Sequence, residues 1–393
     1  MIELLAVRGS ILMTNVNTHS DNGNKIKIVY LITRCAKCGP IDVVYNIAAN
    51  LDKKIFEPYI VTLYPENSKS IINVFKNAGI SCLCAETNKS KILLGQTQKI
   101  KSIIDKISPD IIHSHGAFPG VAASRLHRAP HMITLHCFMR TDYLNEYGIV
   151  IGRLLEALHM HVVKKSDKTL TCSQSLTELY RSKYNLKFDY VLNGIEFSKY
   201  RKVKDETEKV HLRKTLNLPY NKKIFVYAAR LIQRKNQVFL CEVFSNIHND
   251  KILLLLGDGE DYQKLKDTFD TNKNIIFAGY KSNVYDYLRA SDVYISSSKS
   301  EGMPLGVIEA LACGLPVILS DIPQHKEILD CCEGVGLDYI EGSLDDCAEK
   351  INLICSKPNE FNNIREKTIG MFDAAVMSKN YQAEYLKLMS DKQ

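Results

Sequence analysis

The sequence lacks the run of roughly 18–20 apolar residues that a membrane-spanning helix needs. Residues 1–24 lack a basic segment followed by a clean apolar core, so we expect no secretory signal there and interpret them as a loose N-terminal extension. A recognised nucleic-acid-binding motif with interleaved aromatic residues is also missing, which disfavours nucleic acid as a partner. These absences indicate a globular protein that acts on something other than nucleic acid.

The twelve cysteines do not form the pattern of a disulfide scaffold or of a zinc ribbon. Most of them, such as Cys172, Cys241 and Cys313, lie within apolar runs and are typical of small buried side chains in a reducing cytosol. Cys35-Ala-Lys-Cys38 is a lone pair, and a zinc ribbon needs a second pair at matching spacing. We therefore expect neither a disulfide framework nor a metal site.

The net charge of +7 is moderate for 393 residues and suits anionic ligands or an anionic membrane surface. One basic helix is predicted from about Ser90 to Ile107, and such a helix can bind the surface of a membrane. Its cations are Lys91, Lys99, Lys101 and Lys106. A basic face that is simply solvated explains these residues at least as well, so both interpretations stay open.

From Lys25 onward, short apolar strands alternate with helices, which predicts parallel sheets covered by helices on both faces. The expected strands are 27–32, 59–63, 80–83, 110–113, 132–135, 169–172, 190–192, 224–228, 251–256, 274–277, 293–295 and 316–319. We therefore expect an α/β protein with two doubly wound, Rossmann-like domains that face each other across a cleft. The expected units are an N-terminal domain at 25–196, a charged linker with a short helix at 197–219, a C-terminal domain at 220–372 and a terminal helix at 373–393.

The most informative motif follows the strand 293–295 and places two carboxylates at the two ends of one strand-to-helix corner. Pro304 suits the first turn of a helix, and Gly314 is suited to end it. Glu301 should therefore lie in the loop at the mouth of the helix, and Glu309 on the helix behind it.

The same corner has features of a phosphate site. A helix N-terminus presents free N–H groups and a partial positive charge to an anion. Small residues at Gly302 and Gly306 would let a ligand approach the backbone closely. Two carboxylates beside a phosphate site suggest a ligand that carries hydroxyls next to phosphates, as a nucleotide sugar does.

Two cations follow the first strand of the second half. Arg230 and Lys235 should project from the loop after 224–228 and from the start of the next helix, where they could clamp a diphosphate. A solvated pair of cations explains the two residues equally well, and Arg234 competes for the second role.

Glycines mark the ends of several other strands. Gly257 and Gly279 end two strands of the second half, and with Lys281 they could flank a phosphate or a base. Gly39 follows the first strand and could hold the backbone close to a ligand. Ordinary turns explain these glycines equally well.

Three histidines come at or just past strand ends in the first half, namely His113, His115 and His136. Each one alone is more often structural than catalytic. Their convergence on one sheet edge shifts the balance toward a functional role.

The motifs, taken in order, resemble the retaining glycosyltransferases of group 1, or family four, which have the two-domain GT-B fold. The resemblance covers the chain from about Lys27 onward, and its most specific part is the pair Glu301 and Glu309. The other matching segments are the Gly39 turn, His113-x-His115-Gly116, Thr134-x-His136, Asn193-Gly194-Ile195-Glu196, Arg230-Leu231-x-x-x-Lys235 and Gly257-Asp258-Gly259. The turn at Gly39-Pro40-Ile41-Asp42 departs from the Gly-Gly and acidic residue of many members, which leaves the contacts of that loop undetermined.

The resemblance implies a role for each matching residue. Glu309 would bind the ribose, while Glu301 would lie near the donor sugar and support the transition state or orient sugar hydroxyls. Arg230 and Lys235 would clamp the diphosphate, and His136 would face the donor sugar. Backbone amides between Met303 and Gly306 would meet the sugar hydroxyls and the phosphate, and Gly302, Pro304 and Leu305 belong to the same donor-binding segment. The last helix, near Tyr381–Leu388, would cross back to the first domain.

The implied activity is metal-independent transfer of a sugar, with retention, from a nucleotide sugar to the hydroxyl of a glycan or lipid-linked acceptor. A UDP-sugar is the expected donor, no cofactor is expected, and no Asp-x-Asp metal motif stands at a fitting strand end. The expected setting is O-antigen, capsule or other polysaccharide synthesis, in the cytoplasm or at the inner face of the cell membrane. Two alternatives stay open: a nucleotide-sugar epimerase or hydrolase of the same fold, and a non-catalytic nucleotide-sugar-binding partner.

Overall fold

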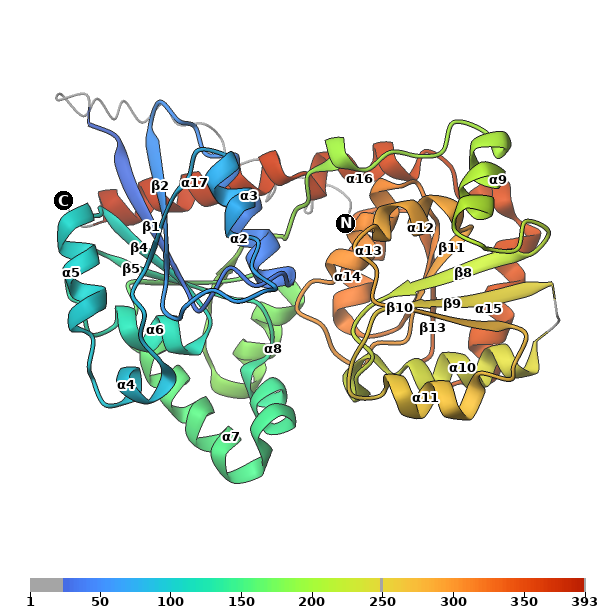
Figure 1. The fold of residues 1–393 in the computed structure, drawn as a ribbon, viewed down its shortest axis with the longest axis horizontal. Helices are drawn as coiled ribbons and strands as arrows, with labels where there is room; N and C mark the ends of the chain where they lie inside the picture. Colours follow the sequence, from blue (N-terminus) through green and yellow to red (C-terminus); the bar gives the residue numbers. More distant parts are fainter. Residues whose placement is uncertain (1–23, 248–249, 392–393) are drawn as a thin grey trace.

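The computed structural model describes residues 24–247 and 250–391, so the predicted N-terminal extension lies, except for Asn24, outside the described residues. The first of two parallel sheets has the strand order β3-β2-β1-β4-β5-β6-β7 (Figure 1). Its strands are β1 Ile26–Ile32, β2 Phe56–Thr62, β3 Ser81–Cys84, β4 Ile111–His115, β5 His131–Leu135, β6 Lys168–Thr171 and β7 Asp189–Tyr190. Its helices are α2 Gly39–Ala49, α3 Ile72–Asn77, α4 Lys89–Leu93, α5 Gln98–Ile107, α6 Ala117–Ala123, α7 Met139–Lys165 and α8 Gln174–Tyr184.

The second sheet has the order β10-β9-β8-β11-β12-β13, and again every neighbouring pair is parallel. Its strands are β8 Lys223–Ala228, β9 Lys251–Leu256, β10 Ile275–Gly279, β11 Val293–Ser296, β12 Val317–Ser320 and β13 Gly336–Tyr339. The helices that follow β7 are η1 Phe197–Lys199, α9 Glu206–Thr215, η2 Gln233–Lys235, α10 Gln237–Asn246, α11 Tyr262–Phe269, α12 Val284–Ala290, α13 Leu305–Ala312, α14 Pro323–Cys331, α15 Leu344–Ser356, η3 Pro358–Glu360, α16 Ile364–Phe372 and α17 Ala374–Ser390.

The predicted fold class, two doubly wound α/β domains, is confirmed. The central strands are buried along almost their whole length, as in β9, where every residue is buried. Fully buried strands are typical of parallel sheets, because the helices that connect parallel strands cover both faces of the sheet. In each sheet the strand order reverses at one point, between β1 and β4 and between β8 and β11. Ligands of doubly wound sheets bind beyond the carboxyl ends of the strands at these points.

Three local predictions need correction. The single basic helix expected at 90–107 is two helices, α4 and α5, because Gly95 adopts the left-handed region at φ +78° between them. The strand β13 was not predicted, since Gly336–Tyr339 is short and only half apolar. Pro304 caps α13 rather than standing in its first turn, because the helix begins at Leu305.

The last helix, α17, lies on the first domain although it follows the second one in the chain (Figure 1). The Ser378 hydroxyl donates to the carbonyl of Ile47 in α2 at 2.9 Å. Tyr385 is fully buried, and its hydroxyl lies 2.8 Å from Nδ1 of His113 in β4. Both ends of the second domain are thus attached to the first. None of the described helices is both long and apolar enough to span a bilayer.

Candidate active site

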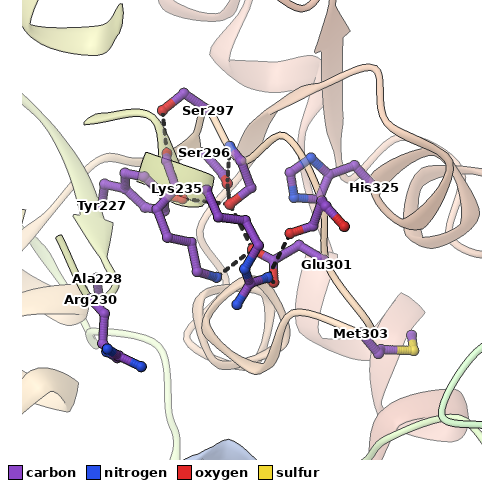
Figure 2. Close-up of polar contacts among 12 residues, drawn as sticks. Tyr227, Ala228, Arg230, Lys235, Ser296, Ser297, Glu301, Met303 and His325 are labelled. Atoms are coloured by element: carbon purple, nitrogen blue, oxygen red, sulfur yellow. Dashed lines mark hydrogen bonds and ion pairs between the residues drawn. The ribbon is translucent and has the colours of Figure 1, made fainter. Parts of the chain in front are cut away.

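Glu301 lies in the loop between β11 and α13 and is surrounded by positive charge (Figure 2). Its carboxylate pairs with Lys235 Nζ and accepts from Arg234 Nη1 at 3.2 Å. The Ser298 hydroxyl donates a third bond at 2.6 Å. Burial alone would raise the pKa of Glu301, but the two cations and the hydrogen bonds outweigh it and lower that pKa to about 2. Glu301 is therefore a fixed anion at neutral pH and cannot serve as a general base there.

Glu309 lies on α13 in the opposite electrostatic situation. The hydroxyl of Tyr200, just after η1, donates to its carboxylate at 3.1 Å. Burial raises the pKa of Glu309 to about 7, and the nearby charge of Asp42 adds to the rise. The Tyr200 bond and the charge of Lys37, which forms no ion pair with Glu309, oppose it. No ion pair to Glu309 is formed by the described residues. Its charge is thus left without a fixed counterion.

The two predicted clamp residues point in different directions. Lys235 turns toward Glu301, whereas the exposed guanidinium of Arg230 lies apart from that cluster (Figure 2). Burial raises the pKa of Cys38 in the first domain, and the nearby charge of Arg230 opposes that rise, so Arg230 lies close to the first domain. The structure brings Arg230 and Lys235 to the same sheet edge without joining them into one clamp.

Arg234, which the sequence leaves as a competitor for Lys235, is part of the same cluster. Its Nη1 donates to the Ser300 carbonyl at 2.6 Å as well as to Glu301, and its Nε lies 4.0 Å from the carboxylate of Asp142 in α7. Both cations of η2 therefore hold Glu301, and one of them also reaches the first domain.

The glycines of the corner are required by packing. A Cβ on Gly302 would lie 1.8 Å from the main-chain oxygen of His136. A Cβ on Gly306 would lie 2.7 Å from the Tyr294 hydroxyl and 3.2 Å from the Ala228 oxygen. The structure therefore gives both glycines a packing reason within the protein itself, and the close approach of a ligand expected from the sequence stays a prediction.

The other glycines predicted to lie at the site, Gly39, Gly257 and Gly279, follow or end strands of the two sheets. Gly39 lies next to Leu305 at the start of α13: a Cβ on Gly39 would lie 3.5 Å from the Leu305 side chain. A Cβ on Gly257 would lie 2.0 Å from the Ala229 oxygen, and the Gly257 amide donates to the Gly279 carbonyl at 2.9 Å. Lys281, next to them, places its ammonium 5.9 Å from the centre of the Tyr287 ring. These residues form close turns at adjoining strand ends, and their contact with a ligand stays a prediction.

The loop before α13 is held by the first domain. The Ser173 hydroxyl donates to the Gly302 carbonyl at 2.8 Å, and Asn193 Nδ2 donates to the Met303 carbonyl at 3.4 Å. Glu327 of α14 accepts from the amides of Gln174 and Ser175 at 2.8 Å each, at the start of α8. Sequence patterns could not indicate Ser173 or Glu327 as site residues, because their partners lie in the other domain.

His136 belongs to a buried chain of imidazoles. Its Nε2 lies 2.8 Å from Nδ1 of His115, whose ring packs at 4.2 Å, centre to centre, against that of His113. Burial lowers the pKa of His136 to about 4, and that of His113 and His115 well below the usual value. All three are therefore neutral at pH 7. The structure confirms that these histidines converge and places only His136 next to the loop of Glu301, through the contact with Gly302.

A metal site is not formed by the part of the chain that the structure describes: no three His, Cys, Asp or Glu side chains are grouped to hold an ion. The expected metal independence stays a prediction.

The chain belongs to the group 1, or family four, glycosyltransferases. The family described as "Glycosyl transferases group 1" matches residues 208–371, and the one described as "Glycosyltransferase Family 4" matches residues 42–199. Together the two matches take in both domains, and the resemblance seen in the sequence is confirmed.

Several curated relatives are glycosyltransferases of bacterial glycan synthesis. A putative teichuronic acid biosynthesis glycosyltransferase of Bacillus subtilis is 32% identical over 220 residues, which are 54% of this chain and 54% of that protein. A galactosyltransferase of Escherichia coli that acts from UDP-Gal on α-D-GlcNAc-diphosphoundecaprenol is 27% identical over 56% of this chain and 60% of its own. The chain thus spans about half to three fifths of the length of these two relatives. An O-antigen biosynthesis glycosyltransferase of Escherichia coli is 26% identical over 78% of this chain and 83% of that one.

Solved structures share the fold. Sucrose-phosphate synthase from Thermosynechococcus elongatus superposes with a TM-score of 0.77 at 18% identity, covering 93% of this chain and 100% of the other. HepE of Anabaena, solved with UDP-glucose, superposes with a TM-score of 0.77 at 16% identity, covering 92% of this chain and 99% of its own.

Proposed function

We propose that this protein is a retaining glycosyltransferase that moves a sugar from a nucleotide diphosphate sugar, a UDP-sugar, to an acceptor hydroxyl. The observation that carries the proposal is the corner between β11 and α13, where one carboxylate is a fixed anion among cations and the other forms no ion pair with the described residues. Membership of the family supports the same activity. We place the reaction in the synthesis of a bacterial polysaccharide or lipid-linked glycan, such as O-antigen or capsule, because the curated relatives are named for such pathways.

The donor nucleotide would bind along α13. The amides of Leu305 and Gly306 open the first turn of the helix and have no acceptor one turn earlier, so they suit the diphosphate. Glu309, which lacks a counterion among the described residues, would accept hydrogen bonds from the ribose hydroxyls. Arg230 adds an exposed cation at the same edge, so the site can neutralise a diphosphate from the protein's own groups, without a metal or cofactor.

Transfer would proceed by cleavage of the bond between the anomeric carbon and the diphosphate oxygen. Positive charge grows on the sugar, and negative charge grows on the leaving diphosphate, where Arg230, Lys235 and the N-terminus of α13 stabilise it. Glu301, fixed as an anion, would stabilise the sugar's positive charge or orient its hydroxyls. A leaving phosphate oxygen takes the proton of the acceptor hydroxyl as that hydroxyl attacks from the same face, which retains the anomeric configuration.

His136 would contribute a hydrogen-bond donor. Nε2 of His115 is buried without a partner among the described residues. A buried N–H without a hydrogen-bond partner is rarer than a buried acceptor without one. We therefore assign the proton of His115 to Nδ1, which donates to Nε2 of His136. Neutral His136 then carries its proton on Nδ1 and can donate it to an oxygen of the donor sugar.

The acceptor would be a glycan or a lipid-linked sugar at the inner face of the cell membrane. One curated relative acts on a sugar attached to diphosphoundecaprenol. The surface that would meet the bilayer is treated separately below.

The test is a turnover assay with UDP-glucose, UDP-galactose and UDP-N-acetylglucosamine, each with and without bacterial lipid extract and with EDTA present. The proposal predicts acceptor-dependent release of UDP and an α-linked product, seen by NMR. An epimerised donor without UDP release would favour the epimerase, and acceptor-independent release would favour the hydrolase. Tight binding of UDP, GDP, ADP or CMP in a thermal-shift panel without any turnover would favour the binding-only alternative.

A further inference from the structure

The helix α7 doubles back on itself. Gly148 interrupts it with φ +73° and ψ −179°, a backbone conformation in which a side chain would be strained. A Cβ on Gly152 would lie 2.7 Å from the Tyr143 carbonyl oxygen, so the two arms touch where only glycine fits. The segment around Gly148 is thus the tip of a helical hairpin, which projects from the first domain (Figure 1).

Polar contacts fix the two arms of this hairpin. Arg140 Nε in one arm donates to Glu156 in the other at 2.8 Å, and the Tyr143 hydroxyl lies 2.8 Å from Nδ1 of His159. Glu156 is almost fully buried and also accepts from Tyr184 of α8. The hairpin is therefore a rigid element, and whatever lies at its tip is held in place.

The tip is apolar and exposed. The exposed fractions are 76% for Ile149, 83% for Val150, 55% for Ile151 and 70% for Leu154, four residues that together we call the α7 tip. Beside it, Leu94 at the end of α4 is 75% exposed. Contiguous apolar side chains held in water are unfavourable, and such patches mark surfaces that are covered by a partner.

Two lysines of α4 lie beside this hairpin. Lys89 at the start of α4 donates to the Tyr147 hydroxyl at 3.1 Å, which joins α4 to the hairpin beside Gly148. Lys91 is exposed on the same short helix. Arg153 lies within the tip, but its Nη1 donates to Glu156 at 3.3 Å, so the two lysines of α4 are the cations available to a partner. Glu146, beside Tyr147, is the exposed acidic residue on this side of the hairpin, and the two lysines outnumber it. Apolar side chains flanked by lysines match an anionic lipid bilayer, where the apolar groups enter the acyl region and the cations meet the headgroups.

We propose that the α7 tip, with α4 beside it, inserts into an anionic bilayer and holds the enzyme there. The choice of a bilayer over a protein partner rests on the proposed function, whose acceptor would be lipid-linked. The position of the hairpin agrees with it: Asp142 lies near Arg234 of the candidate site, and the helical segment from Asp142 to Tyr147, just before Gly148, spans about 8 Å. A bilayer at the tip would therefore lie close to the site where a membrane-held acceptor must arrive.

The proposed surface shares Lys91 with the basic helix predicted from the sequence, and the other three lysines of that prediction lie on α5. The lysines of α5 lie on a separate helix, beyond Gly95, and Lys99 there is 3.9 Å from Glu86. The structure assigns Lys89 and Lys91 of α4 to the binding surface instead.

The experiment is vesicle flotation of the full chain with phosphatidylcholine alone and with phosphatidylcholine containing 30% phosphatidylglycerol. We expect the wild type to float with the anionic vesicles. The triple variant Ile149→Ser, Val150→Ser, Ile151→Ser should bind them at least about 30-fold more weakly, because three side chains no longer enter the acyl region. Replacing Lys89 and Lys91 by Gln should weaken binding about fivefold per lysine and remove most of its salt dependence.

Matched controls are Ile340→Ser and Lys264→Gln, exposed residues of the second domain that should leave flotation unchanged. Equal flotation of the wild type and the triple variant would overturn the proposal, as would a wild type that does not float. A triple variant that turns a dimer into a monomer in sedimentation, without any vesicle binding by the wild type, would assign the tip to self-association instead. UDP binding by the triple variant should equal that of the wild type, so a failure of the donor site would appear there and not in flotation.

Discussion

Glu301 and Glu309 stand eight residues apart on one corner, yet their carboxyl groups behave oppositely. The pKa of Glu301 is lowered to about 2, and that of Glu309 is raised to about 7. Both are taken out of water, so burial pushes both pKa values upward. The difference comes from η2, whose Lys235 and Arg234 reach Glu301, whereas Glu309 has a tyrosine hydroxyl as its partner.

The contrast teaches how one residue type can take two roles at one site. A carboxylate fixed by two cations stays ionised through the reaction and can hold sugar hydroxyls as a charged acceptor. A carboxylate without a counterion is free to accept hydrogen bonds from a ligand. Variants of each carboxylate should therefore fail in different ways, and the predictions below begin with the largest expected failure.

Glu301→Gln should lower the transfer rate by about 100-fold or more, since the fixed anion is lost from the reacting centre. It should also lower the free energy of unfolding by about 3 kcal/mol, because Lys235 and Arg234 keep their charges without an anion between them. Initial rates and urea denaturation measure the two effects. Glu341→Gln, at an exposed carboxylate, is the control and should change neither. A fully active Glu301→Gln enzyme would break the contrast.

Gly302→Ala should lower kcat/KM about tenfold or more, because its Cβ would lie 1.8 Å from the His136 oxygen and the loop carrying Glu301 would have to withdraw. Gly370→Ala is the matched control: nothing lies within 4 Å of its Cβ, and it stands inside α16. That control should keep full activity and gain about 0.5–1 kcal/mol of stability. Equal activity of the two variants would show that the first domain does not hold the loop.

Much of the fold could be predicted because each central strand is a short, fully apolar run between turns, as in Lys251–Leu256. The edge strand Gly336–Tyr339 was missed since half of it is polar. The break between α4 and α5 at Gly95 was not predicted, because the basic, helix-forming pattern continues on both sides of Gly95.

The candidate site could be predicted only where its parts are neighbours in the chain. The spacing from Glu301 to Glu309 is local, and a strand followed by a helix fixes it. The bond from Tyr200 to Glu309 joins residues 109 positions apart, and no pattern in the sequence links them. The reason for glycine at 302 likewise lies in the other domain, at the carbonyl of His136.

The smallest expected effect is on stability, and it tests the raised pKa that distinguishes Glu309 from Glu301. Its folded pKa of about 7 exceeds the ordinary value of 4.5, so the folded state binds more protons between these pH values and loses stability as pH rises through them. Glu309→Gln removes this loss while keeping an acceptor for Tyr200. Its melting temperature should exceed that of the wild type by about 3 °C at pH 8, and the gap should close toward pH 5. Parallel melting curves from pH 5 to 8 would contradict the raised pKa.

The most direct test of the account is calorimetric titration of UDP into the wild type, Glu301→Gln and Glu309→Ala, with EDTA present. The account predicts that Glu309→Ala binds UDP about tenfold or more weakly, since the ribose hydroxyls lose a charged acceptor. Glu301→Gln should bind UDP within about threefold of the wild type, because Glu301 acts on the sugar and not on the nucleotide. Equal UDP affinity of the wild type and Glu309→Ala would contradict the division of roles between the two carboxylates.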